Sequence, residues 1–172
     1  MSLRFQISDL LAHPGQGREE SAVLAVDVGL SNASVDDEVV VSVTLRSLTD
    51  GVVVRGAAQT TVDLTCNRCL TGWSEELSVP IESVFRLHPD DEDDELPVEA
   101  GGWIDLEPVI HDEVALALPT RPVCREDCPG LCPTCGTDLN VEPCDGHGEE
   151  SDSPFAALQQ LFAGEPSQQS DS

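Results

Sequence analysis

The cysteines of this 172-residue chain restrict its fold more than any other feature, because they stand in two distant groups. The first group is a C-x2-C pair in the segment CNRCL. The second is a C-x3-C-x3-C-x2-C run within CREDCPGLCPTCG, and a C-x2-H pair follows it. The donors are Cys66 and Cys69 in the first group, and Cys124, Cys128, Cys132, Cys135, Cys144 and His147 in the second. A fold must either join these groups through disulfides or metal, or leave the thiols free.

Metal is the better explanation of this pattern. A C-x2-C turn places two thiolates on one side of the chain, where both reach one zinc ion through bonds of ~2.3 Å. The chain has seven cysteines, an odd number, and residues 1–11 show no charged and then apolar signal segment. We therefore expect a cytoplasmic protein, and structural disulfides are rare in that reducing compartment. No apolar run approaches the ~20 residues of a membrane span, so we expect no membrane association.

Eight donors suit two zinc ions, since a structural zinc ion takes four ligands. The division that follows the order of the chain gives two sets, Cys66, Cys69, Cys124 and Cys128, and Cys132, Cys135, Cys144 and His147. The alternative is one zinc ion held by the two C-x2-C pairs, Cys66 and Cys69 with Cys132 and Cys135. Cys124, Cys128, Cys144 and His147 would then be spare.

The donor sets indicate structural metal, and we expect no enzyme activity. A catalytic zinc ion keeps a position for water, usually beside three protein ligands, whereas thiolates are plentiful here. A thiol redox protein using one C-x2-C pair is an alternative, although the chain lacks the expected βαβ setting. Three arginines stand among the donors: Arg68, Arg121 and Arg125. They either offset thiolate charge or form a local cationic patch.

The charge of the chain argues against broad, nonspecific binding to nucleic acid. Eight basic residues, all of them arginine, stand against thirty-three acidic residues, which gives a formal net charge of −25. Such a field repels phosphate backbones and attracts basic proteins. Simple solubility is an alternative explanation of the charge.

The apolar pattern predicts an α+β fold, with an antiparallel sheet or partial barrel, one main helix and a zinc-binding, cysteine-rich C-terminal segment. Alternating residues predict strands, with a turn at Thr49–Gly51 and an edge position or bulge at Pro80. The helix is predicted within 105–118, where Asp105 is a candidate cap and Pro119 a stop. The predicted strands cover residues 4–11, 21–30, 38–48, 51–64 and 75–88, with a loop at 13–20 and a turn at 31–37.

We expect one domain over residues 1–148. It consists of a β-rich part at 1–88, an acidic loop at 89–102 that contains DDEDDE, the helical segment at 105–118 and the cysteine-rich segment at 121–148. Residues 149–172 form a polar tail, in which SPFAALQQLF predicts a short amphipathic helix at 153–162.

CNRCL, followed by LPTRPVCREDCPGLCPTCGTDLN, closely resembles the YceD family of bacterial and plastid proteins. The valine-rich hairpin before CNRCL, the acidic stretch and the closing SDSPFAALQQLF extend the resemblance over residues 4–162. It implies a role in the synthesis, processing or stability of 23S ribosomal RNA during biogenesis of the large subunit. Some members lack the pair at Cys132 and Cys135, which implies that Cys66, Cys69, Cys124 and Cys128 form the core site.

The resemblance also implies a kind of partner. The family's gene is often found beside that of a small basic protein of the large ribosomal subunit. An acidic chain suits contact with such a protein, or with a ribosomal precursor particle that carries it. We expect an assembly factor that acts through protein contacts, and a zinc-stabilised adaptor unrelated to ribosomes is the alternative.

Overall fold

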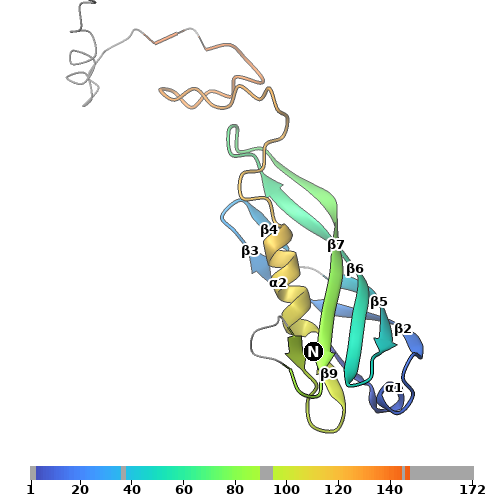
Figure 1. Cartoon of the computed structure of the whole chain (residues 1–172). Coiled ribbons are helices and arrows are strands. Elements are labelled where there is room, and N and C mark those ends of the chain that lie inside the picture. The colour runs from blue at the N-terminus through green and yellow to red at the C-terminus, as the bar shows by residue number, and fades with distance from the viewer. Residues whose placement is uncertain (1–2, 36–37, 90–94, 145, 148–172) are drawn as a thin grey trace, which may run out of the picture.

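A long hairpin of two fifteen-residue strands, β6 (Gly51–Thr65) and β7 (Gly72–Arg86), forms the centre of the structure. The computed structural model describes residues 3–35, 38–89, 95–144 and 146–147. The far end of the hairpin extends beyond the other strands, and the segment after the main helix passes close to it (Figure 1). The turn at this end contains Cys66 and Cys69.

The remaining strands of the main sheet flank this hairpin. On one side β6 pairs with two strands along its length, first with β5 (Glu38–Ser47) and then with β4 (Ala33–Val35). Beyond them, β5 pairs with β2 (Gly17–Ala25), and β4 pairs with β3 (Val28–Gly29). On the other side β7 pairs in parallel with β8 (Glu95–Pro97) over its last three residues. All other pairs are antiparallel. The sheet curls into a half-barrel with one main helix, which confirms the predicted fold class.

The main helix, α2 (Glu107–Ala117), closes one face of the sheet (Figure 1). A small second sheet, β1 (Arg4–Gln6) with β9 (Trp103–Asp105), and the short helix α1 (Ser8–Ala12) lie at the opposite end from the cysteines. The Asp105 carboxylate accepts a 2.9 Å hydrogen bond from the backbone N–H of Glu107 at the start of α2. No helix among the described residues is long and apolar enough to cross a membrane.

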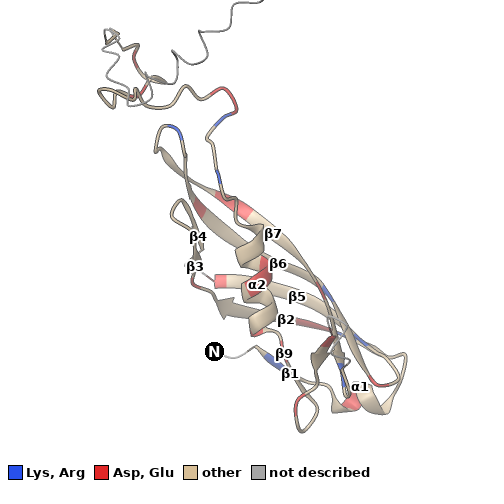
Figure 2. Cartoon of the chain, turned by 60° about the vertical axis from the view of Figure 1, so that its left-hand side comes forward, with Lys and Arg blue, Asp and Glu red and all other residues tan. Residues whose placement is uncertain are grey.

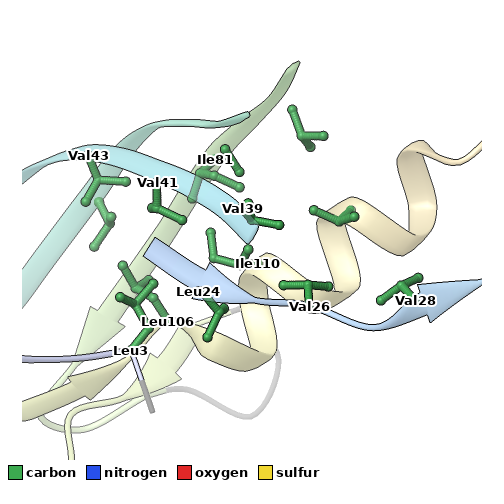
Figure 3. Close-up of a cluster of buried hydrophobic side chains, with 14 of the residues drawn as sticks. Leu3, Leu24, Val26, Val28, Val39, Val41, Val43, Ile81, Leu106 and Ile110 are labelled. Atoms are coloured by element: carbon green, nitrogen blue, oxygen red, sulfur yellow. The ribbon is translucent and has the colours of Figure 1, made fainter. Parts of the chain in front are cut away.

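The core lies between α2 and the inward face of the sheet. In β5 the odd-numbered residues, Val39, Val41, Val43 and Leu45, are buried, because successive side chains of a strand point to opposite faces. They pack with Leu24, Ile81 and, from the start of α2, Leu106 and Ile110 (Figure 3). Burial of these apolar side chains is the main source of stability for the sheet and the helix.

Two residues of the hairpin, Gly56 and Pro80, suit their positions in the sheet. Gly56 faces β5 so closely that a Cβ atom there would lie 2.0 Å from the carbonyl oxygen of Ser42, which excludes any larger residue. Pro80 pairs with Ala57 of β6, whereas β8 pairs with β7 only from Val84 onward. Among the described residues, the other edge of β7 is therefore free at Pro80, as the edge-strand prediction requires.

The sequence predicts α2 and the central hairpin more accurately than the short elements. A strand over residues 4–11 is wrong beyond Gln6, because the chain turns there into α1, and both its N-cap residue Ile7 and Leu10 within it are buried. Residues 17–20 belong to β2 and residues 33–35 to β4, not to a loop and a turn. The acidic loop at 89–102 includes β8, where Glu95 makes a 2.8 Å ion pair with Arg86. The tail at 149–172 and its predicted helix at 153–162 lie outside the described residues.

Candidate metal centres

The structure brings all eight predicted donors together in two groups of four. The first centre consists of Cys66, Cys69, Cys124 and Cys128, and the second of Cys132, Cys135, Cys144 and His147. In each centre the four donor atoms lie within 4.8 Å of one another. The first centre joins the β6–β7 turn to the segment that follows α2, and the second forms within the C-terminal segment alone. This division follows the order of the chain and differs from the alternative single site.

The sulfur distances fit a tetrahedral ion. Bonds of ~2.3 Å to such an ion place its sulfur ligands ~3.8 Å apart. The Sγ atoms are 4.0 Å apart in Cys66 and Cys128, 3.7 Å in Cys69 and Cys124, and 3.7 Å in Cys135 and Cys144. All seven cysteines are free, and each of these three separations is too long for a disulfide. The donors of each centre could therefore hold one metal ion.

The two C-x2-C turns share the same backbone hydrogen bonds. In the first turn, the N–H of Cys66 donates to the carbonyl of Thr71, and the N–H of Leu70 donates to the carbonyl of Cys66. In the second turn, Cys132 and Thr137 make the corresponding bond at 2.8 Å, and Gly136 donates to Cys132 at 2.9 Å. Such closed turns hold the two sulfurs of each pair on one side.

Sequence reasoning missed a threonine in each turn. The hydroxyl oxygen of Thr71 lies 3.3 Å from the Sγ of Cys69, and that of Thr137 lies 3.2 Å from the Sγ of Cys135. A hydroxyl at this distance can donate to a thiolate and stabilise its charge. The signal was present as the repeated pattern C-x2-C-x-T, in CNRCLT and CPTCGT.

Backbone and hydroxyl donors lower the pKa of two thiols in each centre, Cys66 and Cys69 in the first and Cys132 and Cys135 in the second. Hydrogen bonding from the backbone of Cys124, then of Cys69 and Arg68, lowers the pKa of the Cys66 thiol to about 6. In the second centre, the Thr137 hydroxyl and backbone lower the pKa of Cys135 to about 6. Desolvation and neighbouring sulfurs raise the pKa of Cys124 to about 12. Closely spaced sulfurs cannot all ionise without a cation, which is the chemistry expected of a metal centre.

Comparison with known proteins identifies the family to which the chain belongs. Residues 54–162 match the family model described as large ribosomal RNA subunit accumulation protein YceD, and this range contains every cysteine and His147. The chain belongs to the YceD family.

Proteins similar to this YceD-family chain come from bacteria and a plant. An uncharacterized protein of Mycobacterium tuberculosis is 37% identical over 147 residues, which cover 80% of this chain and 70% of the relative. One from Mycobacterium leprae is 33% identical over 157 residues, covering 82% and 71%. The large ribosomal RNA subunit accumulation protein YCED homolog 1, chloroplastic, of Arabidopsis thaliana is 26% identical over 137 residues, covering 62% and 43%. No solved structure matches the chain.

Arg68 has a role in this YceD-family protein that neither sequence interpretation anticipated. Its Nη1 atom donates to the backbone carbonyls of Glu126 and Cys128, at 2.9 Å each. Its own carbonyl accepts from the N–H of Leu131 at 2.9 Å. Gly130 lies so close that an added Cβ atom would sit 2.9 Å from this carbonyl oxygen. Arg68 therefore ties the β6–β7 turn to the cysteine-rich segment by hydrogen bonds that need no metal.

The two centres of the YceD-family protein differ in exposure. Three of the four donors of the first centre, Cys66, Cys69 and Cys128, are buried in a small cluster with Trp73 and Leu131 packed against it. In the second centre only Cys132 is buried, Cys144 is partly exposed and Cys135 is exposed. The first centre is thus part of the packed structure, while solvent reaches the second.

Proposed function

We propose that this protein is a non-catalytic zinc-binding factor in the biogenesis of the large ribosomal subunit. It supports the synthesis, processing or stability of 23S ribosomal RNA in the cytoplasm, and it acts through contacts with one or more basic ribosomal proteins or with a precursor particle. Membership of the YceD family, whose description names accumulation of large-subunit ribosomal RNA, carries the proposal. The family is described as an accumulation protein, and its description names no reaction.

The donor sets support zinc in a structural role. Each centre offers four protein ligands, sulfur in all but one case, which fills a tetrahedral ion and leaves no position for a substrate or water. Zinc at the first centre would join the hairpin to the C-terminal segment in place of disulfide bonds. Four thiolates, or three thiolates and an imidazole, also suit zinc better than the hard cations that prefer oxygen.

The charge distribution supports a basic partner. Five arginines form ion pairs with acidic side chains: Arg4, Arg18, Arg55, Arg86 and Arg125. Arg68 binds backbone carbonyls. Among the described residues this leaves Arg46 and Arg121 without such partners, whereas acidic residues are spread over the sheet and α2 (Figure 2). Few cations are thus available to bind RNA phosphates, and many carboxylates are available to bind a basic protein.

A deletion and complementation experiment tests this function. Cells without the gene should accumulate less 23S ribosomal RNA and show a lower large-subunit peak in ribosome profiles. The wild-type chain should restore both, whereas a chain with Cys66→Ala and Cys69→Ala should not, because it lacks the first centre. His111→Ala is a matched control, since His111 is exposed and its hydrogen-bond partner is the adjacent Asp112.

Three other results would contradict parts of the proposal. An unchanged large-subunit peak after deletion would instead favour an adaptor unrelated to ribosomes. Cysteines that react freely with a thiol reagent before any chelator is added would favour a thiol redox protein. Recovery of naked 23S RNA fragments at physiological salt, with no ribosomal protein, would contradict the protein-mediated mechanism.

A further inference from the structure

Asn140 lies in the sequence between two donors of the second centre and contacts a donor of the first. Its amide nitrogen Nδ2 lies 3.5 Å from the Sγ of Cys128 and 2.6 Å from Oδ1 of Asp138. The backbone N–H of Asn140 donates to the same Asp138 oxygen at 2.9 Å. Both neighbours of the amide are acceptors, so the nitrogen must face them and the amide orientation follows from the chemistry. The other amide atom, Oδ1, is buried without a hydrogen-bond partner among the described residues.

The segment that carries Asn140 is anchored at both ends by the second centre. Cys135 precedes it and Cys144 follows it, and their sulfurs are 3.7 Å apart. Within the segment, the N–H of Leu139 donates to the carbonyl of Gly130 at 3.0 Å, beside the first centre. A metal ion at the second centre would therefore close a loop whose middle touches the first centre.

We propose that Asn140 couples the two centres, so that metal binding at the second centre strengthens metal binding at the first. Closing the loop between Cys135 and Cys144 restricts the position of Asn140 and keeps its N–H on the Cys128 sulfur. A metal-bound thiolate retains negative charge, so an N–H donor stabilises it and raises the affinity of the centre for the metal ion. Coupling of this kind is reciprocal, and metal at the first centre strengthens the second by the same factor.

The inference rests on the metal binding proposed above, but goes beyond it in assigning an order to the two centres. The first centre is mostly buried, and the second is open to solvent. The exposed centre therefore exchanges metal with its surroundings, and the buried centre responds through Asn140. The protein then holds its hairpin and C-terminal segment together most firmly only when both centres are filled.

A double-mutant cycle on the full chain tests the coupling. Zinc affinity of the first centre is measured by competition with a chromophoric chelator. Cobalt spectra assign the occupied centre, because a four-sulfur site and a three-sulfur, one-nitrogen site absorb differently. The four proteins are wild type, Asn140→Leu, a second-centre variant with Cys135→Ala and Cys144→Ala, and the combination. Asn140→Leu keeps the side-chain volume and removes the donor.

Loss of the second centre should weaken zinc at the first by about three- to tenfold in the wild-type background, as expected for the net contribution of one ordinary hydrogen bond. The same loss should change the affinity less than about twofold when Asn140 is leucine. Asn140→Gln, which keeps the amide, should retain part of the coupling. A merely structural role of Asn140 would lower stability without this dependence on the second centre.

Either of two results would overturn the inference while leaving the proposed function intact. One is an equal loss in both backgrounds, which would assign the coupling to the backbone contact between Leu139 and Gly130. The other is zinc at both centres with no coupling at all. Absence of zinc from both centres would overturn this inference and the metal part of the proposed function together.

Discussion

Leu70 and Gly136 occupy the same position in the two C-x2-C turns, and both have a left-handed backbone. Their φ angles are +61° and +76°, and Leu70 is the one non-glycine residue with positive φ among the described residues. Each donates its N–H to the carbonyl of the first cysteine in its turn. The first turn thus adopts the glycine conformation with a leucine, whose side chain is 65% exposed. The backbone requirement of the turn, and not packing of this side chain, sets the conformation.

Exchanging these residues should therefore have opposite effects on stability. A left-handed conformation costs an L-residue about 1–2 kcal/mol, and glycine in turn loses about 0.5–1 kcal/mol more chain entropy on folding. Leu70→Gly should leave the free energy of unfolding unchanged or raise it by up to about 1 kcal/mol, while Gly136→Leu should lower it by about 1 kcal/mol. Chemical denaturation of the zinc-loaded chain measures both. A clear loss of stability in Leu70→Gly would show that the exposed side chain makes contacts that stabilise the fold.

Loss of the first centre should destabilise the protein more than loss of the second. The first centre joins the hairpin turn to the segment after α2 and buries three of its cysteines. A structural zinc site contributes directly to folding, so Cys66→Ala should lower Tm by about 10 °C. Cys135→Ala, at an exposed donor, should lower it by only about 3 °C. Thermal unfolding with and without EDTA measures both changes in Tm. In Cys66→Ala, EDTA should lower Tm only a little further, because the first centre is already lost.

The opposite order of effects, or a wild-type Tm that EDTA does not change, would contradict this prediction. A Tm that EDTA does not change would show that contacts other than metal hold the C-terminal segment against the hairpin. The hydrogen bonds of Arg68 are the contacts that would then carry this role.

Substitution of Arg68 distinguishes two roles for its side chain, hydrogen bonding to backbone carbonyls and compensation of thiolate charge. Its guanidinium bridges the carbonyls of Glu126 and Cys128, and each such bond contributes about 1 kcal/mol. Arg68→Ala should lower the free energy of unfolding by about 2 kcal/mol. Arg68→Lys should lower it by about 1 kcal/mol, because the lysine nitrogen ends one bond nearer the backbone than Nη1, the single atom that makes both bonds. Denaturation of both variants measures the difference. If lysine restored full stability, charge compensation of the thiolates would be the dominant role.

The sequence indicates which cysteines and histidine come together better than it predicts the short strands, and the reason is physical. Donors such as Cys66 and Cys69 lie in a fixed local spacing that has few other uses, so the pattern indicates its chemistry directly. The strands β1, β4, β8 and β9 are each three residues long, and pairing with distant partners determines them. Arg68 and Asn140 escaped prediction for the same reason, because their partners come from other parts of the chain. Thr71 and Thr137 were predictable from the repeated turn motif.

Binding of a basic partner should depend strongly on salt. Most arginines of this protein are paired within the chain, so its surface presents unpaired carboxylates, and attraction between exposed charges is screened beyond about 8 Å at physiological ionic strength. The affinity of the purified chain for a small basic large-subunit ribosomal protein should fall at least about tenfold between 50 and 300 mM salt, through slower association. Fluorescence anisotropy with a labelled ribosomal protein measures this. An acidic protein of similar size and charge is the matched control, and it should bind more weakly at every salt concentration. Equal binding by that control would show that net charge alone explains the contact and that the shape of this fold contributes nothing to it.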